Sequence, residues 1–179
     1  PIEGCWVQRD WKNDGVAVVA VARRQPDGAL VYGNYLVDYL CAGLKDTAVS
    51  ADLPPGTFHK DLLPTLFHKQ QVEITVEIAH EIVHGGIEYA AQWGLRPHRD
   101  FRLSQYILDP PEAHERTGQV EFGKDGKPFY IAGPRDNVRR ILEQLRRTAG
   151  EGNFNVMTPV VDLPDVEEEH DEEEEDGLW

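Results

Sequence analysis

The chain is poor in cysteine and has no long hydrophobic run, and each absence excludes a class of protein. Only Cys5 and Cys41 are present, without a CxxC pair, so neither a disulfide framework nor a thiolate zinc site is expected. Reduced thiols fit better than the alternative, a single bridge between the two. The longest apolar stretches are far shorter than the roughly 20 residues that span a bilayer, and the first residues lack the layout of a secretory signal. We therefore expect a cytoplasmic protein with no membrane partner.

Lysine and arginine are missing from the acidic end of the sequence. The chain has 179 residues and a formal net charge of −14, yet eleven of its acidic residues lie between Asp162 and Asp176. The other 21 acidic and 18 basic residues leave a net charge of only −3. A segment that repels itself and has little to bury is expected to stay disordered. We predict one domain over residues 1–161 and a disordered acidic tail over residues 162–179, which is a solubilising extension, a contact for a basic partner or an intramolecular mimic of nucleic acid.

The clearest secondary structure is a hairpin near the N-terminus. Residues 16–24 and 29–41 are rich in Val, Ala, Tyr and Leu, and they flank a Pro- and Gly-containing turn at residues 25–28. Both faces of the second strand are largely apolar, so we expect it to be central in its sheet. Asp38 is then a candidate buried carboxylate, with a strand-end salt bridge as the preferred account.

The middle of the chain predicts mainly helix. Residues 42–56 are interpreted as a long surface connection and residues 60–69 as a short helix. Thr75 is a plausible N-cap of the principal helix, whose apolar stripe runs to Trp93. The first positions of this helix alternate in polarity and could instead be strand.

The C-terminal third predicts a second hairpin and a second helix. An Asp125-Gly126 turn lies between strands predicted at residues 119–122 and 128–132. A helix follows over residues 136–148, with a short strand after it. The fold class we predict is α+β, with an antiparallel sheet from two β-hairpins packed against two main helices.

Three stretches of the chain carry a resemblance to known sequences. They are VARRQPDGALVYGNYLVDYLCAGLKDT, GIEYAAQWGLRPHRDF and FGKDGKPFYIAGP. The chain resembles a family of uncharacterised bacterial proteins, and the likeness extends from residue 1 to about residue 157. It implies a bacterial, cytoplasmic setting and a tail that is an addition, and it implies no activity.

One motif, His80-Glu81-Ile82-Val83-His84, indicates chemistry. On a helix, two histidines four residues apart face the same side and suit two ligands of a tetrahedral Zn²⁺, and a Glu after the first His can activate a metal-bound water. The motif lies where a helix is expected independently. A third ligand is required, and His98 is the one we favour, with Asp100 and His59 as alternatives.

Helical geometry also supports an interpretation without metal. Ala79, Ile82, Val83, Gly86 and Ala90 form the apolar stripe of the helix, whereas His80, Glu81 and His84 fall on the opposite, polar side. A solvated helix face would have the same sequence as a metal site in a cleft. Gly85 and Gly86 each cost about 1 kcal/mol relative to Ala, so we expect close packing at Gly86 to compensate, with a hinge as the alternative and Gly85 on a less crowded face.

A second candidate site is the junction at Gly133-Pro134-Arg135. The chain passes there from strand to helix N-terminus, where free N–H groups favour an anion, and Arg139 and Arg140 add positive charge. A phosphate or nucleic-acid contact is the functional interpretation, and a plain connection is the alternative.

Two classes of function therefore follow from the sequence. The first is a zinc-dependent hydrolase in which His80, His84 and His98 bind Zn²⁺ and Glu81 is the catalytic base. The alternative is a non-catalytic binding or regulatory protein that contacts a basic protein or a nucleic-acid-bound assembly through its domain and acidic tail.

Overall fold

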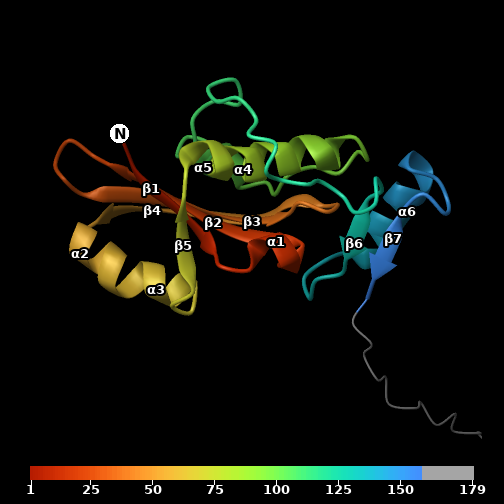
Figure 1. The fold of residues 1–179 in the computed structure, drawn as a ribbon, viewed down its shortest axis with the longest axis horizontal. Coiled ribbons are helices and arrows are strands. Elements are labelled where there is room, and N and C mark those ends of the chain that lie inside the picture. The colour runs from red at the N-terminus through yellow and green to blue at the C-terminus, as the bar shows by residue number, and fades with distance from the viewer. Residues whose placement is uncertain (159–179) are drawn as a thin grey trace, which may run out of the picture.

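The computed structural model describes residues 1–158, and its centre is a five-stranded antiparallel sheet with helices on both faces (Figure 1). The protein is therefore of mixed α+β class. The acidic tail predicted over residues 162–179 lies outside the described residues. The strands follow the order β4-β3-β2-β1-β5, and their bounds are β1 (Ile2–Gln8), β2 (Val16–Arg24), β3 (Leu30–Asp38), β4 (Gly43–Leu53) and β5 (Gln71–Ile74).

The predicted N-terminal hairpin is confirmed as β2 and β3. Its register runs from Val16 opposite Asp38 to Arg24 opposite Leu30. Gly28 in the turn has φ +88°, a left-handed conformation that glycine adopts without a steric penalty. Strand β3 lies between β2 and β4, so its predicted interior position is also confirmed.

Asp38 ends β3 and is completely buried. Its carboxylate accepts hydrogen bonds from the backbone N–H groups of Leu40, Cys41 and Ala42, at 3.0, 3.0 and 3.1 Å. The preferred account, a strand-end salt bridge, is therefore wrong, because the side chain closes the turn into β4 instead. Burial raises the pKa of this carboxyl to about 6 in spite of the three hydrogen bonds.

The surface connection predicted over residues 42–56 is also wrong, because most of it is β4. This strand forms the edge of the sheet and pairs with β3 from Leu30 opposite Leu53 to Asp38 opposite Gly43, with two register shifts. Many of its side chains are exposed, so it lacks the alternation of a half-buried strand. Pairing with β3 stabilises β4 where its own pattern does not.

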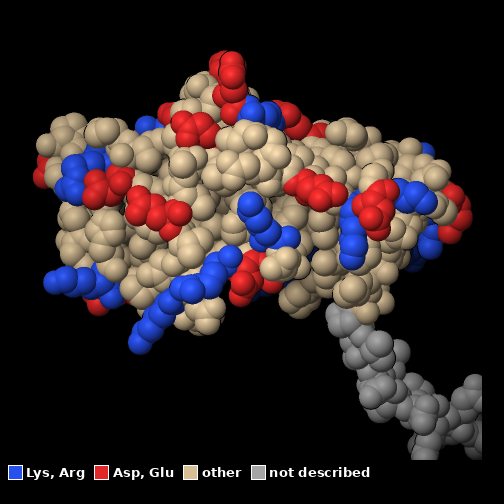
Figure 2. Space-filling model, viewed as in Figure 1, with Lys and Arg blue, Asp and Glu red and all other residues tan. Residues whose placement is uncertain are grey.

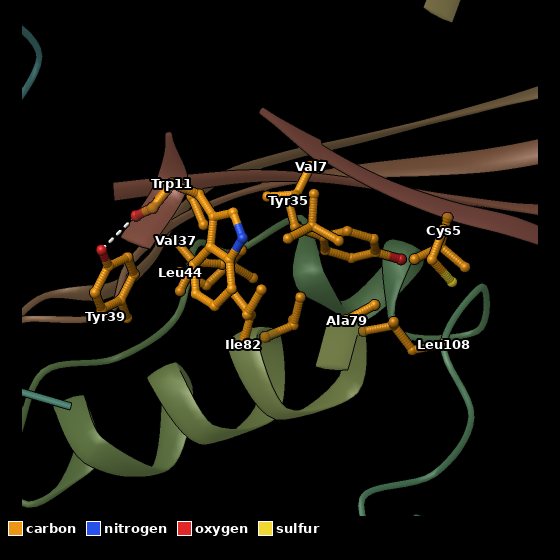
Figure 3. Close-up of a cluster of buried hydrophobic side chains, with 14 of the residues drawn as sticks. Cys5, Val7, Trp11, Tyr35, Val37, Tyr39, Leu44, Ala79, Ile82 and Leu108 are labelled. Carbon is orange, nitrogen blue, oxygen red and sulfur yellow. Dashed lines mark hydrogen bonds between the residues drawn. The ribbon is translucent and has the colours of Figure 1, made fainter. Parts of the chain in front are cut away.

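One face of the sheet is covered by the principal helix, α4 (Val76–Ala91). The Thr75 side chain accepts a hydrogen bond from the N–H of Ile78 at 3.4 Å, which confirms the predicted N-cap. The predicted apolar stripe is buried, and Ala79 and Ile82 point from α4 toward the strands (Figure 3). Two short helices, α1 (Trp11–Asp14) and α5 (Phe101–Ser104), precede and follow α4 in the sequence.

The opposite face carries one continuous helical segment that includes Phe58. It consists of α2 (Pro55–Thr57), a π-helical turn η1 (Phe58–Leu62) and α3 (Leu63–Leu66), so the helix predicted over residues 60–69 begins and ends earlier than expected. Phe58 is fully buried, and its ring centroid lies 5.5 Å from those of both Trp6 and Tyr32. Burial of these rings holds the segment to the sheet.

The predicted second hairpin is wrong. Residues 119–122 form no strand, and strand β6 (Phe129–Ile131) pairs in parallel with β7 (Asn155–Met157). The Asp-Gly turn forms, but only one bridge, between Lys124 and Lys127, flanks it. Helix α6 (Val138–Thr148) connects β6 to β7 and confirms the predicted second helix.

The two absences in the sequence have structural counterparts. Within residues 1–158, no helix has the length and apolarity needed to cross a membrane. Cys5 and Cys41 are both buried and unbridged, which confirms reduced thiols. Burial raises the pKa of the Cys5 thiol to about 12, so that sulfur is an apolar group in the core rather than a nucleophile.

Helix α4 approaches the sheet closely because Gly86 has no side chain. A Cβ atom at Gly86 would lie 2.5 Å from Cγ1 of Val37, which is buried in β3. Gly43 of β4 faces the same contact, since a Cβ there would lie 2.8 Å from the carbonyl oxygen of Gly86. The predicted close packing at Gly86 is confirmed, whereas Gly85 is crowded as well, because its Cβ would lie 2.3 Å from Phe122.

We expect Gly86→Ala to destabilise the protein by about 1–3 kcal/mol, because Val37 is a stiff, buried side chain that cannot yield cheaply to an extra methyl group. This net loss already includes the roughly 1 kcal/mol that alanine gains over glycine in a helix. Gly56→Ala in α2 is the matched control, since a Cβ there meets nothing within 4 Å. Denaturant unfolding of both variants measures the difference, and equal stability would contradict the close contact.

Candidate functional site

The residues of the HExxH motif are buried, so the solvated helix face considered from the sequence is wrong. The exposed fractions of His80, Glu81 and His84 are 1%, 2% and 6%. The segment of residues 109–118, which we call the strap, hydrogen bonds to all three side chains. In Figure 1 this loop lies over α4 on the side away from the sheet. A polar helix face can thus be covered by the backbone groups of a loop, which a helical projection does not reveal.

Glu81 is held by the end of the strap. Its carboxylate accepts hydrogen bonds from the N–H and the hydroxyl of Thr117 and from the N–H of Gly118, with N–H distances of 2.7 and 3.1 Å. Arg116 donates to the Glu81 carbonyl oxygen at 3.1 Å and pairs with Glu88 two turns further along α4. A general base needs a carboxylate oxygen free to accept from water. In this arrangement the Glu81 carboxylate instead fastens the strap to the helix.

The two histidines contact the beginning of the strap. Nε2 of His80 lies 2.8 Å from the carbonyl oxygen of Pro110, and Nε2 of His84 lies 3.2 Å from that of Asp109. Because a carbonyl oxygen only accepts, both Nε2 atoms carry a proton and donate. Burial, followed by the nearby His80, lowers the pKa of His84 to about 4. Both Nε2 atoms are therefore engaged in holding the strap rather than available to a metal ion.

The favoured third ligand, His98, lies elsewhere. Its N–H donates to the carbonyl oxygen of Leu44 and its ring contacts Asp100, and none of its described contacts joins it to the HExxH histidines. The alternative ligand His59 lies near Glu3, beside Phe58 on the opposite face of the sheet. Within residues 1–158 no group of three or more His, Cys, Asp or Glu side chains is arranged to hold a metal ion.

The imidazole that does lie beside the motif is His114 of the strap. Its ring centroid is 5.0 Å from that of His80, which is 4.3 Å from that of His84. Nε2 of His114 is 2.7 Å from the Asp109 carboxylate, which also accepts from Arg23 of β2 at 2.5 Å. These contacts lower the pKa of Asp109, with the His114 hydrogen bond as the largest cause. No spacing rule relates residue 114 to the motif, so the sequence carried no signal for this neighbour.

A cavity lined by charged groups lies apart from the motif, and we call it the cationic cavity. It has a volume of about 680 Å³ and lies between the start of β4, the segment of residues 94–98 and the N-terminal half of α6. Four basic side chains and one carboxylate line it: Lys45, Arg96, Arg135, Arg140 and Asp136. His98 and the amides of Asn137 and Gln144 complete its polar wall.

The single carboxylate of the cationic cavity is already engaged. Asp136 accepts from Nζ of Lys45 at 2.7 Å, from the Tyr130 hydroxyl at 2.7 Å and from the N–H of Gly133 at 2.8 Å. Burial alone would raise the pKa of Asp136, but these donors outweigh it and the pKa is lowered. The carboxylate thus stays ionised and neutralises Lys45, which leaves three arginines of the lining in excess.

The sequence anticipated this site in part. Arg135 and Arg140 line the cavity as parts of the predicted anion contact, whereas the exposed Arg139 pairs with Glu143 at 3.0 Å and does not line it. Lys45, Arg96 and His98 were missed because they come from distant segments. On the face seen in Figure 2, basic and acidic side chains are interspersed and neither sign dominates, in keeping with the small net charge outside residues 162–176.

No family model, no curated protein and no solved structure matches this chain. The resemblance to a family of uncharacterised bacterial proteins stays a prediction. The site must therefore be interpreted from its own geometry.

We expect the protein to lose stability as the pH falls from about 6.5 toward about 4, because unfolded His84 takes up a proton in this range and folded His84 does so only near pH 4. His84→Gln keeps an N–H donor for the Asp109 carbonyl oxygen but does not titrate, so it should flatten this part of the profile. Urea unfolding at several pH values measures the effect. Identical pH profiles for the two proteins would show that His84 is not the group responsible.

Proposed function

We propose that this protein is a non-catalytic binding or regulatory protein whose ligand is a small phosphate ester held in the cationic cavity. The observation that carries the proposal is the charge of the lining: four basic side chains face one carboxylate, and that carboxylate is neutralised by Lys45. Among residues 1–158, the ion pairs include Lys45 and Arg135 but neither Arg96 nor Arg140. Guanidinium groups bind phosphate through paired hydrogen bonds, so an anion of this kind satisfies both arginines.

The size and floor of the cavity favour a small molecule. Its volume of about 680 Å³ falls within the range of roughly 300–1,000 Å³ that is typical of small-molecule sites. Ala42, Leu44, Leu95 and Ile141 give it an apolar part beside the charged rim. A ligand that combines a phosphate with an apolar group would contact both surfaces.

The lining supports binding rather than chemistry. Among the described residues that line the cavity there is no Ser, Thr, Cys or Tyr side chain that could be a nucleophile. Asp136 accepts hydrogen bonds from three donors. Nδ1 of His98 accepts a hydrogen bond from the N–H of Asp100 at 3.3 Å. The lowered pKa of Asp136 makes its carboxylate a weak base, and the nitrogen of His98 that can accept a proton already accepts a hydrogen bond.

We expect phenyl phosphate to bind and inorganic phosphate to bind more weakly, since only the former can use the apolar floor. Arg96→Gln and Arg140→Gln should each weaken binding of phenyl phosphate about tenfold or more, because each removes a charge-assisted hydrogen bond. Titration calorimetry at low salt measures both affinities.

Arg139→Gln is the matched control for Arg140→Gln. It removes the same charge one residue away, from a side chain that pairs with Glu143 outside the cavity. Its affinity should stay within about twofold of the unaltered protein, as expected for an exposed pair. Equal losses at Arg139 and Arg140 would reduce the effect to general charge attraction and reject the cavity as the site.

The zinc-dependent hydrolase is the second candidate, and the clustering of three imidazoles favours it. His114 lies beside His80 and His84, and a cavity of about 620 Å³ opens onto His84 between Ile87, Phe101 and Pro110. A water-activating role for Glu81 would require its carboxylate to leave Thr117 and Gly118. This candidate therefore depends on displacement of the strap.

Zinc titration decides between His114 and His98 as the third ligand. If the cluster holds Zn²⁺, about one equivalent should raise the melting temperature, because a ligand selective for the folded state stabilises it. His84→Ala and His114→Ala should abolish this rise while His98→Ala retains it, and the opposite result for the last two variants assigns His98. A melting curve that Zn²⁺ leaves unchanged rejects the hydrolase.

A further inference from the structure

We infer that the chain's own acidic segment, residues 162–176, occupies the cationic cavity and competes with its ligand. This inference rests on the proposed function and names how that site is regulated. The segment holds eleven carboxylates and no lysine or arginine, whereas the cavity lining has three basic side chains in excess over its one carboxylate. The acidic segment and the cavity lining thus carry net charges of opposite sign.

The course of the chain brings the segment close to the cavity. Strand β7 ends at Met157, whose carbonyl oxygen accepts from the N–H of Ala132 at 2.9 Å. Arg135 of the cavity lining is three residues beyond Ala132, at most about 11 Å along an extended chain. Asp162 is five residues beyond Met157 and reaches up to about 18 Å from it. The first carboxylates therefore have enough chain to reach the rim without any change in β7.

Because the acidic segment belongs to the same chain as the cavity, weak contacts are sufficient to hold it there. A short linker gives its segment an effective concentration on the order of millimolar at the site it can reach. Each single pair of an exposed carboxylate and guanidinium contributes little, but several carboxylates can replace one another at Arg96, Arg135 and Arg140. A segment that binds as a free peptide with a dissociation constant of about 0.1 mM would then fill the cavity about nine-tenths of the time.

Two other roles of the acidic segment are outcomes of the test. A basic partner protein would bind the segment away from the cavity, and a solubilising extension would contact nothing. Loss of eleven negative charges also raises the affinity for any anion at low salt, so direct binding of the segment at Arg140, and not at Arg139, is what distinguishes a segment that lies in the cavity. Because Arg96, Arg135 and Arg140 are exposed, this binding should also be lost as salt screens their charges.

The experiment compares the full-length protein with a full-length variant in which the eleven Asp and Glu residues of 162–176 are replaced by Asn and Gln. The variant should bind phenyl phosphate about tenfold or more tightly than the unaltered protein at about 0.01 M ionic strength, since its cavity is no longer occupied. The difference should disappear at about 1 M, where the Debye length is about 3 Å. Equal affinities at low salt overturn the inference and leave the proposed function standing.

A second measurement keeps the two proposals separable. A synthetic peptide of residues 162–176 is added to the neutralised variant, and its binding is followed directly by calorimetry or by chemical shifts. Binding should weaken with Arg140→Gln and stay unchanged with Arg139→Gln. If phenyl phosphate binds to neither chain, the proposed function fails, and this peptide titration alone still supports or overturns the contact.

Discussion

The close approach of α4 to the sheet is the contact on which the rest of the structure depends. Gly86 and Gly43 let backbone meet backbone there, with Val37 filling the remaining space. This contact sets how α4 is turned, and hence that His80, Glu81 and His84 face away from the sheet toward the strap. It also sets where the chain leaves the helix, so that Arg96 and His98 arrive beside Lys45 of β4. Both candidate sites are thus consequences of one helix position.

Local signals predicted the elements that local interactions stabilise. The β2–β3 turn, the Thr75 cap and the stripe of α4 each depend on neighbouring residues, and each is confirmed. Strands β4, β6 and β7 depend instead on pairing with other segments of the chain. Strand β7, for example, pairs with Phe129–Ile131, which lie far before it in the sequence. The Asp125-Gly126 turn predicts a hairpin, but only a single bridge, between Lys124 and Lys127, flanks it.

The candidate sites divide in the same way. The spacing of His80 and His84 correctly places both on one side of a helix, but whether that side meets solvent, metal or protein depends on a loop some thirty residues later, through contacts such as Thr117 with Glu81. Arg135 and Arg140 could be predicted because they lie where the chain enters α6, and neighbouring residues are enough to recognise that helix. Arg96 could not be found, because its place in the cavity follows from the packing of α4.

The parallel pairing of β6 with β7 has a consequence for biosynthesis. All five strands of the main sheet and α4 lie within residues 2–91, so they can assemble before the rest of the chain has been made. Strand β6 has no strand partner until β7 emerges, and the ribosome needs roughly 1–5 s to add the 26 residues from Ile131 to Met157. The α6 wall of the cationic cavity is then the last part of the described fold to be fixed in place. Ribosome-bound or proteolytically shortened chains that lack β7 would retain the sheet and the buried HExxH helix while lacking a complete wall of the cationic cavity.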